Sequence, residues 1–504
     1  MSRRRFIGDG ARVLAGFAAT RPAVEMTRPD GLRLKTLAGD NVAVDRSALA
    51  DLRRTLKGEV IVGGMAEYEA ARRIWNAAID RRPALIARCV DVHDIAAVVR
   101  FGERHDALIA VRAGGHHAAG FAMCEGGLVI DLTRLNGVAV DPVRKIASVG
   151  GGATFAEYDA ATQQHGLAST GPIISMVGVA GYTLGGGLGW LHRRIGLASD
   201  NLVAAQIVTA DGHVLDVSPT KDADLFWAIR GGGGNFGVVS GFEFRLTPLL
   251  GVTAGILVHP LEALPDVAAF VRAFNETAPD DVSVWLMLRR APASKVFPPE
   301  LHGRPVAVLS VCYADSTPEG DAALAVLRRF GRPLVDDVRP RAYREWQRAL
   351  DGAWLDGFGN HWDGLFLPEL TDASVQTLFD AVLRVTSPFS DVKIISMGGA
   401  VTRMADHATA FAHRRSRYAL AIQTRWAAGD SPADHLAWSR GLAAAMQVHG
   451  TGGAYANFMP EERGRRVTEA YPAATFARLR EIKAAFDPHN RFRVNHNIPP
   501  ARKG

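Results

Sequence analysis

The 504-residue chain lacks the motifs that mark several common enzyme classes. Its three cysteines, Cys89, Cys124 and Cys312, are odd in number and far apart, which excludes a disulfide framework and a CxxC metal or redox site. No GxSxG nucleophile elbow, Walker A loop or HExxH sequence occurs. We therefore expect no metal site and none of the chemistries that these three motifs support.

Long apolar runs and blocks of one charge are also missing. No run approaches 18 apolar residues, so we expect no membrane-spanning segment. The net charge of +6 permits attraction to anions, but the basic residues are spread along the chain and are not interleaved with aromatic residues. We therefore expect no nucleic-acid partner. With 48% apolar and 22% charged residues, the composition is that of an average globular protein.

The N-terminus supports two interpretations. MSRRRFIG resembles a twin-arginine export signal, but Gly8, Asp9, Gly10 and Arg12 interrupt the apolar stretch and no clean A-x-A cleavage site follows. A basic, disordered leader is the alternative. The sequence therefore leaves the localisation open between the cytoplasm and export.

Length and pattern predict two domains, because single hydrophobic cores stop growing at roughly 250 to 300 residues. Short apolar runs alternate with helical patterns from about residue 60, and this pattern of apolar residues changes after FEFRLTPLLG. A helix near the C-terminus is broken at Asp487-Pro488 and is followed by an extended segment. The expected divisions are a leader and N-terminal extension over 1–59, a first domain over 60–250, an α+β domain over 251–450, and a segment over 451–504 that returns to the first domain.

An α/β unit leads into the first unusual segment. Residues 84–89 and 107–114 are predicted strands, and 92–105 have the apolar spacing of a helix. VRAGGHHAAG follows at 111–120 and contains two adjacent histidines, His116 and His117. Consecutive residues of an extended chain point to opposite faces, so the two histidines are a poor chelating pair.

Glycine is the residue in excess, with 52 in the chain. One of the two densest runs contains a formal G-x-G-x-x-G at Gly232, Gly234 and Gly237. A Rossmann site requires a strand before this fingerprint and a helix after it, whereas a helical DLFWAIR precedes it here and a strand-like VVSGFEFRL follows. Glycine backbone could instead close around a large planar or phosphate-bearing ligand, or it could serve only turns and bulges.

Five stretches together resemble the berberine-bridge-enzyme-like flavoproteins, a branch of the vanillyl-alcohol-oxidase superfamily, from about residue 60 to 500. They are RAGGHHAAG, TGPIISMVGVAGYTLGGGLGWLHRRIGLASDNL, DLFWAIRGGGGNFGVVSGFEFRL, AYANF and FDPHNRFRVNHNIPP. The resemblance implies an α+β, two-domain FAD-binding fold of the vanillyl-alcohol-oxidase type. Residues 60–250 and 451–504 would then enclose FAD, and 251–450 would cover the substrate.

The resemblance also implies how FAD is held. In this family the histidine directly after Arg-x-Gly-Gly is joined covalently to the flavin 8α-methyl group, which places the bond on His116 with His117 as its neighbour. Ile174 stands where many relatives carry a cysteine that makes a second bond, so one covalent bond is expected. The other residues implied to bind FAD are Arg112, Gly114, Gly115, Gly120, Gly171, Val177, Gly178, Gly181, Gly185, Gly186, Gly187, Gly189, Trp190, Asn201, Gly237, Val239, Tyr455, Asn457, Asn495 and Asn497.

Tyr182, Gln423 and Tyr455 occupy the positions that the resemblance gives to catalytic residues. AYANF ends in Phe458 where the family has a second tyrosine, so the base is left open between Tyr182, Tyr455 and another group. Trp362 lies in a stretch that resembles a landmark of the substrate domain, and core packing is the favoured prediction for its side chain.

The implied reaction is a two-electron oxidation of a CH–OH or CH–N centre, with hydride transfer to flavin N5. Val177 lies at the family's oxygen-gate position, where a small residue accompanies fast reaction with dioxygen, so dioxygen is the expected acceptor and hydrogen peroxide the product. The substrate would be a small molecule: a sugar or oligosaccharide, an aromatic alcohol, or an intermediate of secondary metabolism. The alternatives are a dehydrogenase with another electron acceptor and a non-catalytic flavin-binding protein.

Overall fold

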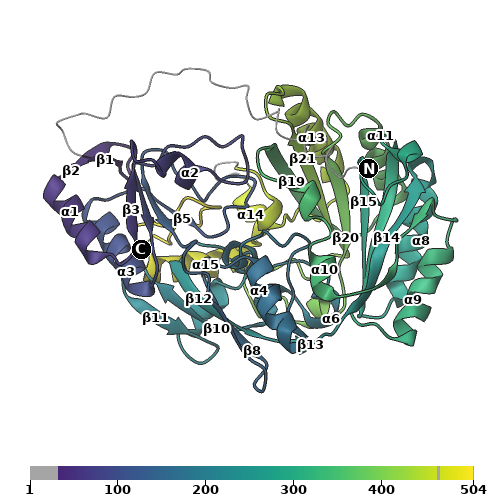
Figure 1. Cartoon of the computed structure of the whole chain (residues 1–504), viewed down its shortest axis with the longest axis horizontal. Helices are drawn as coiled ribbons and strands as arrows, with labels where there is room; N and C mark the ends of the chain where they lie inside the picture. The colour runs from purple at the N-terminus through teal and green to yellow at the C-terminus, as the bar shows by residue number, and fades with distance from the viewer. Residues whose placement is uncertain (1–31, 462–465, 503–504) are drawn as a thin grey trace, which may run out of the picture.

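The computed structural model describes residues 32–461 and 466–502, which form two lobes (Figure 1). The first lobe, on the left in Figure 1, contains residues 32–249 and 467–502. The second lobe, on the right, contains residues 252–447 and is built around one large sheet. The twin-arginine-like motif lies outside the described residues.

The first lobe contains a four-stranded sheet and a five-stranded sheet. The former has the order β3-β4-β6-β5, in which β6 runs parallel to both β4 and β5. The latter, β11-β10-β12-β8-β7, is antiparallel throughout. The strands are β3 (Glu59–Val62), β4 (Leu85–Arg88), β5 (Ile109–Arg112), β6 (Leu128–Asp131), β7 (Val138–Asp141), β8 (Ile146–Gly150), β10 (Leu202–Val208), β11 (Val214–Val217) and β12 (Val238–Arg245), with β9 (Leu167–Ala168) and β13 (Thr247–Pro248) as a separate pair.

Two helices of the first lobe begin at capping residues that the sequence provides. The Asp91 carboxylate accepts hydrogen bonds from two backbone N–H groups at the start of α3, and Thr154 and Glu157 form a capping box on α4. The helices are α2 (Tyr68–Arg72), α3 (Val92–Arg104), α4 (Phe155–Thr162), α5 (Val179–Leu184), α6 (His192–Ile195), α7 (Ala223–Ala228), α14 (Val467–Ala470) and α15 (Ala473–Phe486). Because α7 precedes the G-x-G-x-x-G sequence and β12 follows it, that sequence does not form a Rossmann site.

The N-terminal extension is part of the first lobe from Leu32 onward. The hairpin β1 (Leu32–Lys35) and β2 (Asn41–Val44) is followed by α1 (Arg46–Thr55). Buried Leu34 and Leu52 belong to the same hydrophobic core as α3. Residue 60, expected as the start of the first domain, therefore does not mark a structural break.

The second lobe is an eight-stranded antiparallel sheet with its four long helices, α8, α9, α11 and α13, on one face. Alternate residues of each strand point to opposite faces, so Val284 and Leu286 pack against the helices while Trp285 and Met287 face the first lobe. The strand order is β17-β14-β16-β15-β20-β21-β19, and β18 also pairs with β14. The strands are β14 (Val252–Pro260), β15 (Val282–Arg290), β16 (Pro305–Tyr313), β17 (Val335–Asp336), β18 (Arg339–Arg341), β19 (Gly359–Leu367), β20 (Asp391–Ser396) and β21 (Tyr418–Trp426); the helices are α8 (Leu264–Thr277), α9 (Pro318–Arg329), α10 (Tyr343–Gln347), α11 (Asp372–Leu383), α12 (Ala400–Arg403) and α13 (Pro432–Gln447).

The C-terminal segment is tied to the glycine-rich loop of the first lobe. The Lys483 ammonium donates to the Asn235 carbonyl at 2.6 Å and to the Asp487 carboxylate at 2.6 Å. The Ile498 N–H donates to the Asn235 side chain at 3.0 Å. Both members of the Lys483–Asp487 ion pair are fully buried, so this segment is part of the lobe's core.

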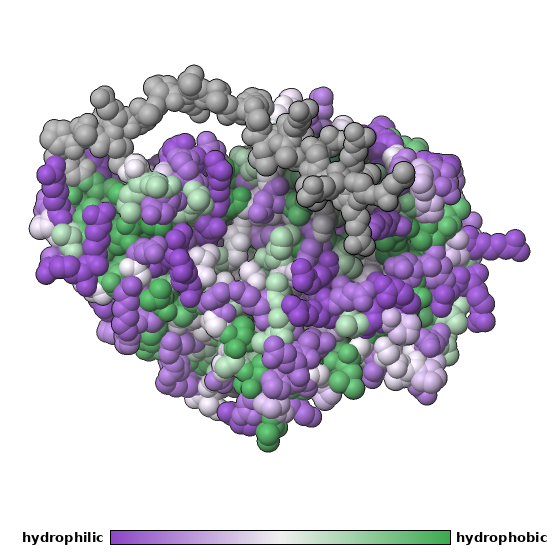
Figure 2. Space-filling view, in the orientation of Figure 1, coloured by the Kyte–Doolittle hydropathy of each residue, from purple (hydrophilic) through white to green (hydrophobic). Residues whose placement is uncertain are grey.

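The surface carries mixed polarity. On the face shown in Figure 2, hydrophilic side chains cover most of the periphery and hydrophobic ones form separate patches. Within the described residues, no helix combines the length and the apolar character needed to cross a bilayer.

Candidate active site

A cavity lies between the two lobes. From the first lobe it is lined by the loop that contains His116 and His117, by α5 and the residues before it, by the loop 233–239 and by the C-terminal tail. From the second lobe, strand residues Trp285, Trp362, Lys393 and Gln423 line it. Deep clefts at domain interfaces are where cofactors and substrates usually bind.

Glycine shapes the first-lobe wall in two ways. Gly114 and Gly178 touch through their backbones, and a Cβ on Gly114 would come within 2.5 Å of the Gly178 nitrogen. Gly181 and Gly234 also line the cavity, but a Cβ on either residue would meet no protein atom within 4 Å. The first pair brings two loops together, and the second pair leaves ligand space open.

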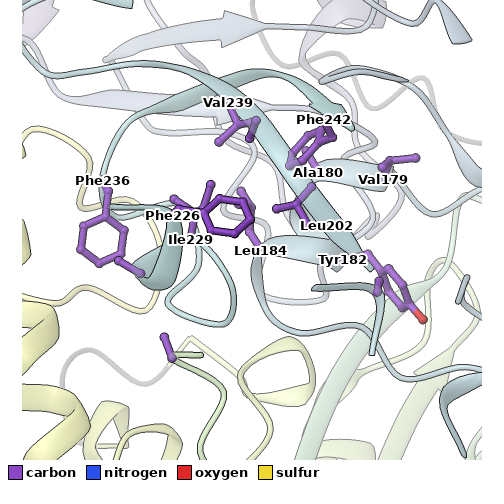
Figure 3. Close-up of a cluster of buried hydrophobic side chains, with 14 of the residues drawn as sticks. Val179, Ala180, Tyr182, Leu184, Leu202, Phe226, Ile229, Phe236, Val239 and Phe242 are labelled. Carbon is purple, nitrogen blue, oxygen red and sulfur yellow. The ribbon is translucent and has the colours of Figure 1, made fainter. Parts of the chain in front are cut away.

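An apolar cluster packs against α5, which forms part of this wall. Val179, Ala180 and Leu184 pack with side chains that include Phe226 and Phe242 (Figure 3). Tyr182 lies at the edge of the cluster with its hydroxyl directed away from it (Figure 3). The helix is therefore held by one set of side chains while its glycine backbone faces the cavity.

His116 is held as a neutral, stacked imidazole. Its ring lies on Trp75 with centroids 4.1 Å apart and an interplanar angle of 17°. Burial lowers the pKa of His116 to about 3, and its Nε2 is buried with no hydrogen-bond partner among the described residues. A neutral imidazole on a ligand cavity is the form that can act as a nucleophile.

His117 lines the same cavity, which corrects the expectation that the two histidines point to opposite faces. That expectation assumed an extended chain, but Gly115 has a φ of +67° and turns the loop. His117 Nδ1 accepts a hydrogen bond from the Ala119 N–H at 3.1 Å, and the ring lies 5.6 Å from that of His496. Burial lowers the pKa of His117 to about 4.

The two predicted tyrosines are protonated at neutral pH. Tyr455 Oη accepts from the Gly187 N–H and from Asn457 Nδ2, each at 2.9 Å, but burial raises the pKa of Tyr455 to about 12. Burial also raises the pKa of Tyr182, whose hydroxyl has no partner among the described residues. Asn457 also donates to the Tyr182 carbonyl at 3.1 Å, so one amide connects both tyrosines.

A lysine that sequence analysis missed stands beside Gln423. Lys393 Nζ donates to Asp391 Oδ1 at 2.6 Å and to Gln423 Oε1, and it lies 4.5 Å from the centroid of the Trp354 ring. Burial lowers the pKa of Lys393 to about 8, although Asp391 opposes this shift. No motif surrounds this residue; its only sequence signal is a lysine at an alternating position in an apolar strand.

Comparison with known proteins identifies the family. A family model described as "FAD binding domain" matches residues 83–218, and one described as "Berberine and berberine like" matches residues 454–499. The chain is 31% identical over 471 residues to (R)-6-hydroxynicotine oxidase of Paenarthrobacter nicotinovorans, an alignment that covers 88% of this chain and 97% of that relative. The chain belongs to the berberine-bridge-enzyme-like family of FAD-linked oxidoreductases. It is therefore an enzyme whose cofactor is FAD.

Solved structures confirm the predicted fold of this family member. 6-Hydroxy-D-nicotine oxidase from Arthrobacter nicotinovorans matches with a TM-score of 0.80 and 29% identity, covering 88% of this chain and 98% of that one. Chitooligosaccharide oxidase shares the fold with a TM-score of 0.79 and 24% identity, covering 90% of this chain and all of the other. The α+β, two-domain fold of the vanillyl-alcohol-oxidase type is thus confirmed.

Most of the residues predicted to bind FAD or substrate meet at the cavity. They come from six separate parts of the chain, which only the tertiary fold brings together. The lining residues among them are Gly114, Gly115, His116, His117, Val177, Gly178, Gly181, Tyr182, Gly185, Gly237, Val239, Gln423, Tyr455, Asn457 and Asn495. The open glycine backbone and the unpartnered His116 Nε2 fit an FAD molecule that lies along this wall.

Nine other predicted residues are not among those that line this cavity. They are Arg112, Gly120, Gly171, Gly186, Gly187, Gly189, Trp190, Asn201 and Asn497.

The side chains of two of the nine have partners within the protein. Trp190 packs between Trp285 and Trp346, with ring centroids 5.1 and 5.0 Å away, and the Asn201 amide donates to two backbone carbonyls at 3.0 and 2.8 Å. Their side chains stabilise the glycine-rich segment rather than line the ligand space.

Trp362 packs in a hydrophobic core, as expected, and it also lines the cavity. Its ring contacts Trp75 and Phe458 edge-on. Sequence analysis also missed Asn235 and His496, both of which line the cavity. Asn235 Nδ2 donates to the His496 carbonyl at 3.2 Å, which holds the C-terminal tail against the glycine loop.

Proposed function

We propose that the protein is an oxidase that removes a hydride from a CH–OH or CH–N carbon of a small molecule and transfers the electrons to dioxygen, giving hydrogen peroxide. The observation that carries the proposal is a cavity in which the glycine-rich loops, Gln423, Lys393 and Tyr455 line the same space. FAD, when bound, supplies the hydride acceptor at N5. The chain's own side chains orient the substrate, exclude water and handle its proton.

We infer that the FAD is held by one covalent bond, to His116. The stacked, neutral ring and its unpartnered Nε2 support this, as does Ile174, an apolar residue on the cavity wall that offers no second link. Acid precipitation tests it: yellow colour should stay with the pellet of the wild type and of His117→Ala, and move to the supernatant in His116→Ala. Colour in the wild-type supernatant would refute the covalent bond, and a colourless protein would contradict FAD binding.

Dioxygen as the acceptor is supported by Val177, a small side chain on the cavity wall. The fold by itself leaves the acceptor open, because one variant of the structural neighbour Phl p 4 is a glucose dehydrogenase and another is a glucose oxidase. Stopped-flow mixing of the reduced protein with dioxygen decides it. Fast wild-type reoxidation that slows in Val177→Ile, with anaerobic reduction unchanged, is the expected result. A wild type that a substrate reduces but dioxygen does not reoxidise would be a dehydrogenase.

The substrate class follows from the second-lobe wall. Trp285, Trp362 and Phe458 provide flat apolar surface, and Lys393 and Gln423 provide the polar groups. None of the described lining residues is an acid, so the wall suits a neutral or anionic molecule better than a permanent cation. The relative (R)-6-hydroxynicotine oxidase is named for a compound with a hydroxylated aromatic ring, which agrees with the flat apolar surface of this wall.

A substrate screen tests this proposal. Aromatic alcohols and hydroxylated aromatic amines should bleach the flavin absorbance without dioxygen and produce hydrogen peroxide with it. Sugars and oligosaccharides serve as the comparison set, and better turnover of these would contradict the aromatic preference. No bleaching by any compound would favour a non-catalytic flavin-binding protein.

A further inference from the structure

We propose that Lys393 is the base that takes the hydroxyl or amine proton of the substrate, and that Asp391 and Gln423 hold it in position. This inference rests on the proposed function, since it names the residue that accepts the substrate proton in that oxidation.

The sheet places Lys393 on the cavity. Asp391, Lys393 and Ile395 alternate along β20, and Ile395 packs in the core that faces the first lobe, so all three share that face of the sheet. Gln423 pairs with Asp391 across β20 and β21. The lysine is 2% exposed in the structure and reaches the same cavity as the FAD-binding loops.

Hydrogen bonding orients the amine. A lysine nitrogen has four tetrahedral positions, of which one is the bond to its own chain. Two of the other three donate, to Asp391 Oδ1 at 2.6 Å and to Gln423 Oε1. One position is left, and in the neutral amine it carries the lone pair. Because Gln423 Oε1 is occupied, its NH₂ group is the end that can donate to a substrate oxygen or nitrogen.

Basic groups near Asp391 reduce the extent to which this carboxylate stabilises the charged form of Lys393. Asp391 on β20 is the one acid in contact with it, but Arg289 on β15 lies 3.7 Å from the same carboxylate. Arg425 on β21 is also close enough to lower the pKa of Lys393. Burial is the largest cause that lowers the pKa of Lys393, Asp391 opposes it, and Arg289 and Arg425 lower the pKa further; the net value is about 8.

Other ionisable groups on the wall are poorer bases. Tyr182 and Tyr455 are protonated at neutral pH, as described above, and Tyr455 Oη already accepts two hydrogen bonds. Burial lowers the pKa of His116 and of His496 to about 3, so both rings hold a proton weakly. A base whose pKa lies near the working pH is the most effective, and Lys393 comes closest to that condition.

In the proposed step, the substrate O–H or N–H bond breaks and its proton joins the lone pair of Lys393 Nζ, giving an ammonium. The adjacent C–H bond breaks with its electron pair as the C=O or C=N bond forms, and bound FAD would supply the acceptor for this hydride. The substrate loses two electrons, and dioxygen takes them with two protons to become hydrogen peroxide. The ammonium then returns its proton to solvent.

Two substitutions separate a base from a fixed positive charge. Lys393→Met removes both functions, whereas Lys393→Arg keeps a charge and donors but cannot accept a proton in the accessible pH range. Lys221→Met, at a lysine with an exposed side chain in the first lobe, is the matched control. The measurements are FAD content and kcat/KM for anaerobic flavin reduction across pH.

The wild type and the control should share a rise in kcat/KM with pH that reflects one ionisation. Both Lys393 variants should retain FAD, lose that ionisation and lose on the order of 10²- to 10⁴-fold in kcat/KM. Activity restored by arginine, or a wild-type pH profile in Lys393→Met, would overturn the assignment of Lys393 as the base.

A binding measurement tests proton transfer to Lys393 without turnover. 4-Nitrophenol changes its visible absorbance when it ionises, and the wild type should lower the apparent pKa of the bound phenol while Lys393→Met should not. An unshifted phenol in the wild type would overturn the proposal. A shifted phenol in a wild type that no screened compound reduces would support Lys393 as a proton acceptor and refute the proposed oxidation.

Discussion

Replacing Gly181 by alanine should separate cofactor binding from folding. Gly181 lies in α5 and lines the cavity, and a Cβ there would meet no protein atom within 4 Å. The new methyl group would therefore not strain the protein. It would project into the space assigned to FAD.

Two effects of opposite sign follow from this geometry. Alanine stabilises a helix by about 0.5–1 kcal/mol relative to glycine. Extra volume in a closely packed site costs about 1–3 kcal/mol, which corresponds to an affinity loss of about 5- to 150-fold for the non-covalent encounter with FAD. The variant should therefore fold at least as well as the wild type and bind less FAD.

Gly441 offers a matched control in α13 of the second lobe. A Cβ there also meets nothing within 4 Å, but this residue is not part of the cavity wall. Gly441→Ala should keep the full flavin-to-protein absorbance ratio, and Gly181→Ala should lower it, while thermal unfolding of the apoproteins shows no loss of stability in either. A full flavin ratio in Gly181→Ala would refute the assignment of this wall to FAD.

Three further changes test other parts of the structure. Trp75→Ala removes the ring under His116, so we expect less FAD in the acid-precipitated pellet, with Trp75→Phe retaining more of it. Asp487→Asn leaves buried Lys483 without its ion-pair partner and should lower the free energy of unfolding by about 3–5 kcal/mol in denaturant titrations. Burial raises the pKa of Asp159 to about 7, above its unfolded value of about 4, so the folded state favours the neutral acid and stability falls as pH rises between these values. Asp159→Asn should remove that fall in thermal unfolding measured across pH, and an unchanged pH dependence would contradict the shift.

Local features of the fold could be predicted from sequence because they depend on neighbouring residues. The apolar spacing of 92–105 gave the helix α3, which spans Val92–Arg104, and the order of helix and strand around Gly232 excluded a Rossmann site. The segment before residue 60 was not recognised as part of the first lobe. Its buried residues, such as Leu34 and Leu52, can be recognised as core residues only from their packing with α3, which lies further along the chain.

The sequence by itself determined the family, the FAD cofactor and most of the residues on the first-lobe wall, because these residues lie in contiguous glycine-rich motifs. Only the tertiary structure decided which side chains from other parts of the chain lie against the predicted site residues. Trp75 lies under His116 and Lys393 lies beside Gln423, although each pair is separated by about 30 residues or more along the chain. The physical reason is that a lysine becomes a candidate base through burial and through the charges around it, and both are set by strands that meet only in the folded sheet.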